Sequence, residues 1–381
     1  MESLLKRLKA QRTAMLTSLN RLVELESPSN NKTALDRLSE HLAAEFKKLG
    51  GRISFHKQDQ TGDHLQVDFP GPGKPVLILG HIDTVWDVGT LASMPFRVSS
   101  GRAFGPGTFD MKAGIVQALY AIRALQELNG RLSRALILLL VADEEVGSHS
   151  SRRITEKLAK QSAAVLVLEP AQGPNGALKT SRKGVGEYHL KVTGREAHSG
   201  LDFEKGASAV LELARQLAAI EKFSDVKRGI TVNPGVIRGG TRTNVIAGEA
   251  GAEIDARVSR LKDIPYLDKK FRSLKPFDKR CKLEIKGGIG RPPMEKSEQV
   301  VALFTLAQQL ARELGWELEE ASVGGGSDGN FTAALGIPTL DGLGAVGDGA
   351  HARHESVVIA EMPRRAALLA RLIEALPVPR V

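Results

Sequence analysis

The sequence has a single cysteine, Cys281, among its 381 residues. One cysteine excludes an internal disulfide and a cysteine-rich zinc module, so any metal must be held by histidine, aspartate and glutamate. Long apolar runs are also missing, because the longest, 135–142, has the length of a strand rather than of a membrane span. We therefore expect a globular protein without a membrane partner.

A secretory signal is not visible either. Residues 1–27 alternate charged and apolar groups at helical spacing and lack the continuous apolar core of a signal peptide. We expect a cytoplasmic location, although a removed precursor segment would leave no trace in this sequence.

Charge of one sign is only mildly in excess. The chain has 53 Lys and Arg against 44 Asp and Glu, a net charge of +9. The densest basic run, 269–282, contains two phenylalanines but no recognised nucleic-acid motif surrounds it. We interpret the run as a solvated face and expect no nucleic-acid partner; a nucleic-acid binder is the alternative, which a salt-dependent binding assay would test.

Strands and helices alternate in the first part of the chain, which predicts a doubly wound, mostly parallel sheet of the α/β class. The second helix is expected to start near Thr33 and Asp36. The predicted helices are 3–26, 33–49 and 112–128, and the predicted strands are 52–56, 64–69, 75–80, 134–142 and 163–168.

The pattern changes after Pro170, where alternating strands predict a two-layer α+β segment with an antiparallel sheet. We therefore expect a discontinuous catalytic domain, 1–178 plus 290–381, with a smaller domain, 179–289, inserted. The elements expected after Pro170 are strands 186–194, 230–238, 250–258 and 281–286, helix 205–222, a linker at 287–293, helix 297–314, strand 316–320 and helix 361–376.

Metal-type ligands follow three of the apolar runs. His81 and Asp83 end VLILGHID, Glu144 and Glu145 end ALILLLVADEE, and Glu169 ends AAVLVLEP. Ionised groups so close to a core need a metal, a cation or shared protons to compensate them. Open α/β sheets bind ligands at the carboxyl ends of their strands, so these residues are expected to share one site.

Two glycine-rich segments add further candidates, Asp110 in GPGTFDMKAG and His351 in GDGAHARHES. Five ligands of this type suit two divalent ions with one bridging carboxylate. The candidate ligands are His81, Asp110, Glu145, Glu169 and His351.

The remaining acids have different predicted tasks. Asp83 lies two residues beyond His81 and can accept the second N–H of that histidine, which would fix its orientation. Glu144 and Glu145 are neighbours at a strand end and should point in different directions. One of them can bind metal while the other serves as a general base toward the attacking water.

Taken together, the motifs resemble the ordered set of the dinuclear zinc carboxypeptidase/aminoacylase family of metallopeptidases. That family includes glutamate carboxypeptidase of the carboxypeptidase G type, acetylornithine deacetylase and succinyl-diaminopimelate desuccinylase. The resemblance covers about 75–356, in order. Its motifs here are GHIDTV, GPGTFDMKAG, ADEEVGS, LEPA, GREAHSG, TNVIAG, IDARV, GGGSDGNF and GAHARHES.

The resemblance implies a zinc-peptidase catalytic domain with an inserted dimerisation and lid domain. Asp110 would bridge two ions, one held also by His81 and Glu169 and the other by Glu145 and His351. Glu144 would be the base and then the acid, assisted by Asp83. The ions would be Zn²⁺, with Co²⁺ or Mn²⁺ as alternatives. The resemblance also implies a cis peptide between Asp110 and Met111.

The inserted domain would supply the other functional side chains. By resemblance, His198 polarises the scissile carbonyl, often from the partner subunit of a homodimer. Asn244 and Arg257 would bind the substrate carboxylate, with help from Gly326 and Ser327 in the GGGSD loop. Alternatively, Arg257 pairs with Asp255 or Glu253, and His198 caps a turn.

Two features of the last loop depart from or complicate the family pattern. His354 is a second histidine, and aligning Glu355 with the acid of the family selects His351. Ser356 stands where an aromatic residue is common.

These observations predict a metal-dependent hydrolase that cleaves an amide bond beside a free carboxylate, resembling the glutamate-carboxypeptidase branch. Its substrate would be a small peptide or an N-acyl amino acid. An N-acyl amino-acid deacylase or desuccinylase is the alternative within the family. A catalytically inactive binding protein of the same fold is the alternative from another class.

Overall fold

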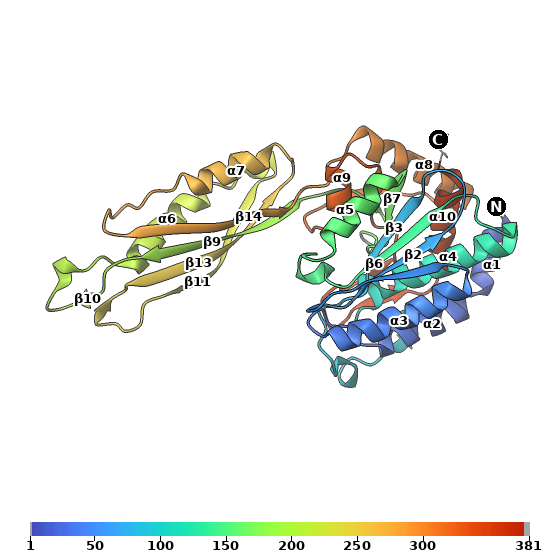
Figure 1. Ribbon diagram of the computed structural model, residues 1–381, viewed down its shortest axis with the longest axis horizontal. Coiled ribbons are helices and arrows are strands. Elements are labelled where there is room, and N and C mark those ends of the chain that lie inside the picture. Colours follow the sequence, from blue (N-terminus) through green and yellow to red (C-terminus); the bar gives the residue numbers. More distant parts are fainter. Residues whose placement is uncertain (1, 377–381) are drawn as a thin grey trace. The chain divides into compact units, whose positions relative to one another are not determined.

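The computed structural model describes residues 2–376, which divide into two compact units (Figure 1). Unit 1 contains the chain up to Ser181, Lys296–Ser322, and the chain from Ser327 onward. Unit 2 contains Arg182–Glu295 and Val323–Gly326. Each unit has its own hydrophobic core.

The central sheet of unit 1 has six strands in the order β1-β2-β6-β3-β7-β16. Strands β6, β3, β7 and β16 run parallel to one another, and β2 runs antiparallel to both of its neighbours, β1 and β6. The predicted mostly parallel α/β sheet is thus confirmed. The strands are β1 (Arg52–His56), β2 (His64–Phe69), β3 (Val76–His81), β6 (Leu136–Val141), β7 (Ala164–Val167) and β16 (Thr339–Leu340).

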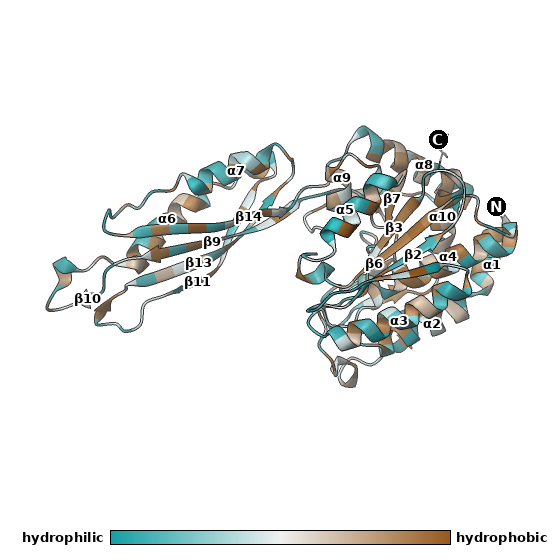
Figure 2. Cartoon of the chain, viewed as in Figure 1, coloured by the Kyte–Doolittle hydropathy of each residue, from teal (hydrophilic) through white to brown (hydrophobic). Residues whose placement is uncertain are grey.

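Strands β3 and β6 are buried along their whole length on both faces of the sheet, which explains why they are almost continuously apolar (Figure 2). Alternate residues belong to different cores: Leu138 packs in the larger core, with α4 and α10, and Leu139 packs in the smaller one with Leu158 of α5. The helices of the second half of unit 1 are α4 (Ala113–Asn129), α5 (Arg152–Gln161), α8 (Glu298–Glu313), α9 (Gly329–Ala334) and α10 (Glu361–Ala375).

The N-terminal helices differ from the prediction in two details. The expected single helix 3–26 is two helices, α1 (Glu2–Ala10) and α2 (Arg12–Glu24), with a break at Gln11. The next helix, α3 (Lys32–Lys48), is capped by Asn31, whose side chain accepts the Ala34 N–H at 3.0 Å. The cap therefore lies earlier than the expected start near Thr33.

Short strands complete unit 1. A four-stranded sheet has the order β17-β18-β5-β4, and a further pair joins β15 to β8. Strand β15 begins at Glu320, so the prediction of a strand at 316–320 was wrong. These strands are β4 (Arg97–Ser99), β5 (Arg102–Phe104), β8 (Leu178–Arg182), β15 (Glu320–Val323), β17 (Gly347–Asp348) and β18 (Ser356–Val358).

Unit 2 is a four-stranded antiparallel sheet, in the order β11-β13-β9-β14, with helices α6 and α7 packed on one face. The alternation in β9, buried Tyr188 followed by exposed His189, follows from having one covered face. The elements are β9 (Gly184–Thr193), β10 (Ala197–His198), α6 (Ala209–Glu221), β11 (Thr231–Gly239), β12 (Val245–Ile246), β13 (Glu249–Val258), α7 (Asp263–Arg272) and β14 (Lys282–Arg291).

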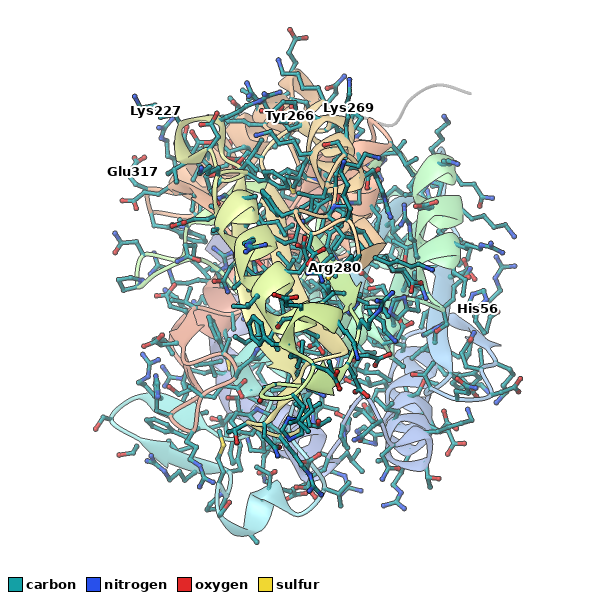
Figure 3. All side chains as sticks on the ribbon, turned by 90° about the vertical axis from the view of Figure 1, so that its left-hand side faces the viewer. His56, Lys227, Tyr266, Lys269, Arg280 and Glu317 are labelled. Atoms are coloured by element: carbon teal, nitrogen blue, oxygen red, sulfur yellow. The ribbon has the colours of Figure 1, made fainter. Side chains whose placement is uncertain are left out.

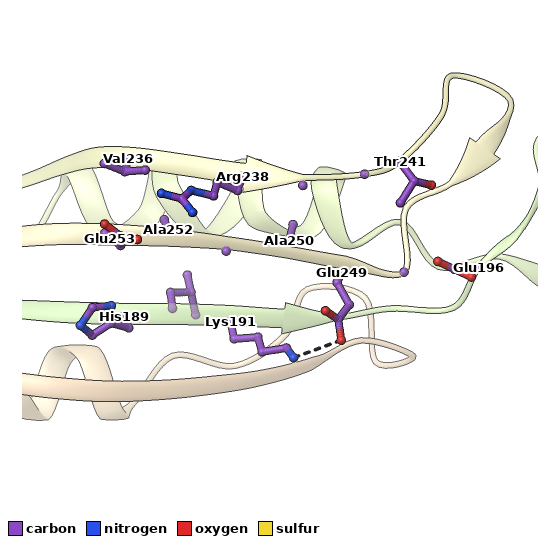
Figure 4. Close-up of a pocket in the computed structure, with 15 residues that line it drawn as sticks. His189, Lys191, Glu196, Val236, Arg238, Thr241, Glu249, Ala250, Ala252 and Glu253 are labelled. Atoms are coloured by element: carbon purple, nitrogen blue, oxygen red, sulfur yellow. Dashed lines mark ion pairs between the residues drawn. The ribbon is translucent and has the colours of Figure 1, made fainter.

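The opposite face of this sheet is polar and contains a hollow of about 620 Å³ (Figure 4). His189 and Lys191 of β9 lie along it, and Lys191 forms an ion pair with Glu249 at 3.0 Å. Residues 287–291, expected as part of a linker, instead continue β14 by pairing with β9. Helix α7 was not predicted.

The basic run 269–282 lies in unit 2, and several of its cations are paired locally. Arg272 contacts Asp268 at 3.3 Å, and Arg280 contacts Asp278 at 2.8 Å. Figure 3 shows Lys269 and Arg280 at separate places among side chains of both charges. Among residues 2–376, no helix has both the length and the hydropathy needed to cross a bilayer.

A buried carboxylate in unit 1 gives a prediction for acid stability. Burial alone would raise the pKa of Asp63, but hydrogen bonds from Lys32, Lys57 and the backbone of Gln58 lower it to about 2. Because the folded pKa is depressed, the stabilisation is complete above the ordinary aspartate pKa and is lost as the pH falls through about 2. We expect Asp63→Asn to lower the free energy of unfolding by about 1–2 kcal/mol at pH 7.

Urea titrations at several pH values measure this effect. The difference between wild type and Asp63→Asn should shrink as the pH falls from about 5 to about 2. A difference that stayed constant over this range would contradict the assignment.

Candidate metal centre and active site

The three strands with acidic or histidine ends are neighbours in the sheet. Strands β6, β3 and β7 lie side by side and run parallel, so their carboxyl ends meet at one edge. His81 is the last residue of β3, and Glu169 follows β7. Glu144 and Glu145 lie in a short 3-10 turn, Glu144–Val146, after β6.

Asp110 reaches this edge from the turn that precedes α4. The turn, Thr108–Lys112, has non-helical backbone angles at Asp110 and Met111, and the peptide between them is cis, as the resemblance implies. Met111 is buried, and its sulfur lies 3.2 Å from the backbone nitrogen of His81. The turn therefore packs directly against the end of β3.

The structure brings the five candidate ligands together in two groups that share Asp110. One oxygen of Asp110, Oδ1, lies 3.1 Å from His81 Nε2, and the other, Oδ2, lies 3.5 Å from His351 Nε2. Glu169 Oε1 is 3.6 Å from His81 Nε2, and Glu145 is 3.2 Å from His351 Nε2. In each group the ligand atoms lie within 4.8 Å of one another, close enough for one ion.

The electrostatics of the two groups favour a cation at each. Burial lowers the pKa of His81, but hydrogen bonds with Asp110 and Asp83 raise it well above its usual range. Hydrogen bonds with Asp110 and Glu145 raise the pKa of His351 to about 10. Burial raises the pKa of Asp110, but hydrogen bonds from both histidines hold it well below its usual range. The acids thus draw compensating positive charge into the site.

The donor set fits divalent ions of the zinc type. Imidazole nitrogen and carboxylate oxygen are ligands of Zn²⁺, and Co²⁺ and Mn²⁺ accept the same atoms. Each group offers one histidine and one carboxylate in addition to the shared Asp110. A carboxylate whose two oxygens face different histidines has the arrangement that a bridging ligand needs.

Asp83 contacts His81, as predicted, and also contacts the turn that carries the two glutamates, which was not predicted. Because β3 ends at His81, Asp83 is not on the strand, and its backbone oxygen makes the shorter contact with His81 Nδ1, at 2.9 Å. Its carboxylate is 3.4 Å from Nδ1 and accepts the backbone N–H groups of Glu144 and Glu145, at 3.2 and 3.1 Å. Asp83 therefore orients the histidine and also fixes the turn that carries both glutamates.

The two adjacent glutamates differ in their surroundings. Glu145 belongs to the second ligand group, and its side chain is 8% exposed. Among the described residues, Glu144 belongs to neither group. Sequence reasoning did not find Asp143, whose buried carboxylate accepts two bonds of 2.7 Å from Ser150 and so fixes the other end of this loop. The run of three consecutive acids, Asp143-Glu144-Glu145, is the sequence feature that could have pointed to Asp143.

The last loop contributes His351 rather than His354. His351 has a left-handed backbone with φ of 61°, which turns its side chain toward Asp110 and Glu145. His354 is exposed, and its nearest acid is Asp348, at 4.0 Å. Ser356, at the position where an aromatic residue is common, is buried and accepts a hydrogen bond from Arg102.

Two of the remaining predicted residues are close to each other in unit 2. His198 lies on β10, which pairs with β12. The next residue, Ser199, donates its backbone N–H to the backbone oxygen of Asn244 at 3.0 Å. His198 Nδ1 accepts the N–H groups of Gly200 and Leu201, each at 3.1 Å. It therefore does cap a turn, and Nε2 is the ring nitrogen left to donate a hydrogen bond.

Arg257 forms an ion pair with Asp255, which was the alternative to a role in substrate binding. Its guanidinium contacts both oxygens of Asp255, at 3.0 and 3.2 Å, and donates to the Gly324 oxygen at 2.8 Å. Gly326, also in unit 2, accepts a bond from Arg182. Ser327 belongs to unit 1 and is fully buried, and its hydroxyl donates to Asp341 at 2.5 Å.

Two curated proteins are similar to this chain over most of its length. The chain is 30% identical to carboxypeptidase G2 from Pseudomonas sp. (strain RS-16) over 370 residues, which cover 95% of this chain and 89% of that protein. It is 27% identical to succinyl-diaminopimelate desuccinylase from Stenotrophomonas maltophilia (strain R551-3), covering 88% and 92%.

Solved structures show the same fold. A tripeptidase from Staphylococcus aureus superposes with a TM-score of 0.82 at 21% identity, covering 96% of this chain and 98% of that one. A dinuclear metal binding peptidase of the M20 family from Bacillus subtilis gives 0.71 at 14% identity, covering 97% and 99%.

The family described as peptidase family M20/M25/M40 matches residues 77–375, a stretch that begins within β3 and ends at the last residue of α10. The match includes all five residues of the two ligand groups, Glu144 and the whole of unit 2. The chain belongs to peptidase family M20/M25/M40.

Proposed function

We propose that this M20 hydrolase cleaves an amide bond next to a free carboxylate and that C-terminal glutamate is its preferred leaving group. The observation that carries the proposal is Asp110, whose two oxygens face His81 and His351 in separate ligand groups. The likeness to carboxypeptidase G2 over nearly the whole chain supports the carboxypeptidase branch.

The ligands would be divided between two ions, most simply Zn²⁺. His81, Asp110 and Glu169 would hold the first, and Asp110, Glu145 and His351 the second. When bound, the two ions would lower the pKa of water and polarise the scissile carbonyl. Asp83 would keep His81 oriented and hold Glu144 and Glu145 in place through their backbone N–H groups.

Glu144 is proposed as the general base and then the general acid. Its carboxylate would take a proton from the attacking water and later give that proton to the leaving amine. Two features support this role: Glu144 directly precedes Glu145 in the same turn, and among the described residues it belongs to neither ligand group.

His198 is proposed to stabilise the negative charge that develops on the carbonyl oxygen. Because its Nδ1 accepts two backbone N–H groups, its Nε2 carries the proton and can donate a hydrogen bond. Asn244 and Arg257, with Gly326 and Ser327, are proposed to bind the substrate carboxylate. For Arg257 this requires that the substrate share or replace its pairing with Asp255.

A hydrolysis screen with zinc tests the proposal. Dipeptides with C-terminal glutamate or aspartate, other dipeptides, and N-acetyl and N-succinyl amino acids should be compared by kcat/KM. We expect the C-terminal glutamate substrates to be cleaved best. Preference for N-succinyl substrates would favour the desuccinylase alternative, which the 27% identical relative keeps open. Hydrolysis of none, with no ion bound, would indicate a binding protein instead.

We also propose that the chain forms a homodimer through the edge strand β11 of unit 2. This strand leaves one side of the sheet unpaired among the described strands, and its Ile237 is 63% exposed. Leu211 and Val210 of the adjacent helix α6 are exposed as well. An exposed edge with apolar side chains is suited to pairing with a second copy.

Ile237→Lys is therefore expected to convert the dimer to a monomer, because it places a charge at the edge where the two strands would pair. Val226→Lys is the control, since Val226 is 78% exposed in a short turn outside β11. Sedimentation velocity should give twice the 41.0 kDa chain mass for the wild type and the control, and one chain mass for Ile237→Lys. A monomeric wild type, or a dimeric Ile237→Lys, would contradict the proposal.

A further inference from the structure

Glu355 is a fully buried carboxylate that contacts the turn carrying Asp110. Its Oε1 accepts the backbone N–H groups of Phe109 and Asp110, at 2.8 and 3.0 Å. Its Oε2 accepts the backbone N–H of Gly107 at 2.9 Å and the indole N–H of Trp86 at 2.8 Å. Each oxygen thus accepts two hydrogen bonds, and all four partners are donors.

These hydrogen bonds join the loop that carries Asp110 to the loop that carries His351. Glu355 lies four residues after His351 in the same loop, and Asp110 lies in the other. The backbone of the two loops is joined as well, since the Gly105 N–H donates to the Glu355 oxygen at 3.3 Å. The position of Asp110 relative to His351 therefore depends on this carboxylate.

The surroundings leave the turn little room to adjust. Gly107 has a left-handed φ of 69°, and a Cβ there would lie 2.7 Å from the Thr84 side chain. Lys112 is buried in the same turn, and its Nζ donates to the Leu25 backbone oxygen at 2.9 Å, which fixes the end of the turn that leads into α4.

We propose that Glu355 is a positioning residue that holds Asp110 where one oxygen faces each ligand group, and that both metal sites depend on it. Glu355 is in neither ligand group, and its oxygens are occupied by the four donors. Charge-assisted hydrogen bonds to buried N–H groups are strong, and their loss would leave those donors unsatisfied. The inference rests on the proposed metal centre.

Glu355→Gln tests whether the acceptor oxygens of Glu355 are needed, because it changes their hydrogen bonding and keeps the size of the side chain. The amide has nearly the shape of the carboxylate, but its NH₂ group would face two N–H donors where an acceptor is required. Partners that orient ligands typically change metal affinity by about 10- to 100-fold when they are replaced. We expect Glu355→Gln to weaken zinc binding at both sites by about that factor.

Glu26→Gln is the matched control. The Glu26 carboxylate also accepts two backbone N–H groups, from Gly89 and Leu91 at 2.8 and 2.9 Å, but that loop carries none of the candidate ligands. Glu26→Gln should leave zinc affinity as in the wild type. Trp86→Phe removes a single donor to Glu355 and serves as a milder variant if Glu355→Gln does not fold.

The experiment titrates each chelator-treated full-length protein with zinc against a chromophoric competitor, and records the visible absorption of the cobalt-loaded forms. Circular dichroism of the apo-proteins checks folding. We expect Glu355→Gln to bind both ions more weakly than Glu26→Gln and to have an altered cobalt spectrum. If that variant does not fold, Trp86→Phe should weaken zinc binding by about threefold.

Zinc affinities and cobalt spectra equal to those of Glu26→Gln would overturn the inference alone, while leaving the proposed function intact. A wild type that bound no zinc would overturn the proposed function and this inference together.

Discussion

Glu144→Gln is expected to lower kcat by about 100-fold or more while two metal ions stay bound, because the amide cannot take a proton from water. The ligand groups do not include Glu144, so the ions should be retained. The substitution keeps the backbone N–H that donates to Asp83 at 3.2 Å, so the turn should keep its shape. Steady-state kinetics and metal content measured on the same sample test both parts.

The matched control for this variant is Glu156→Gln. Glu156 lies on α5, the helix that follows the same loop, and it pairs with Arg152 at 2.7 Å. This control should hydrolyse substrate as the wild type does. A Glu144→Gln enzyme with turnover close to that of the control would remove Glu144 from its proposed role.

Asp110→Asn should have the largest effect on metal content. Asp110 is the only residue shared by the two ligand groups of the described chain, and asparagine supplies one oxygen and no charge. We expect zinc affinity to fall at both sites by more than about 100-fold, beyond the effect of replacing a residue that only orients a ligand. Hydrolysis should be lost with the ions.

His351→Ala is the informative comparison, because it leaves the group of His81, Asp110 and Glu169 complete. That variant should retain one tightly bound ion, measured as zinc per chain after dialysis. If Asp110→Asn also retained one ion with unchanged affinity, the bridging assignment of Asp110 would be wrong.

Much of the α/β sheet could be predicted because buried parallel strands are continuous apolar runs. Strands β3, β6 and β7 are such runs, and their parallel direction follows from the alternation with helices, whereas their order in the sheet, β6-β3-β7, does not. Where a strand depends on its partners, the sequence was less informative. The Gly287-Gly288 pair predicts a linker, yet pairing with β9 makes it part of β14.

The candidate ligands could be predicted from strand ends and glycine-rich segments, and Asp83 could be predicted as a partner of His81. The contacts of Asp83 and Glu355 with backbone N–H groups could not be predicted. Asp83 acts on Glu144 and Glu145 through backbone N–H groups, and Glu355 acts on Asp110 in the same way. Backbone donors are present at nearly every residue, so no sequence pattern indicates which carboxylate they will meet.

The side chains of unit 2 illustrate a second limit. Both the pairing of Arg257 with Asp255 and the turn contacts of His198 were alternatives that the sequence allowed, and both are present. Neither contact prevents a role toward substrate, because an arginine held by Asp255 is oriented and a histidine with an accepting Nδ1 has a defined donor at Nε2.

The central claim is a pair of metal ions bridged by Asp110 that serves amide hydrolysis. Its most direct measurement is zinc per chain, determined on the purified protein together with hydrolysis of a dipeptide ending in glutamate. We predict two zinc ions per chain, loss of hydrolysis when both are removed by a chelator, and recovery when zinc is returned. A folded protein that held no zinc, or that hydrolysed the dipeptide equally well without it, would contradict the account.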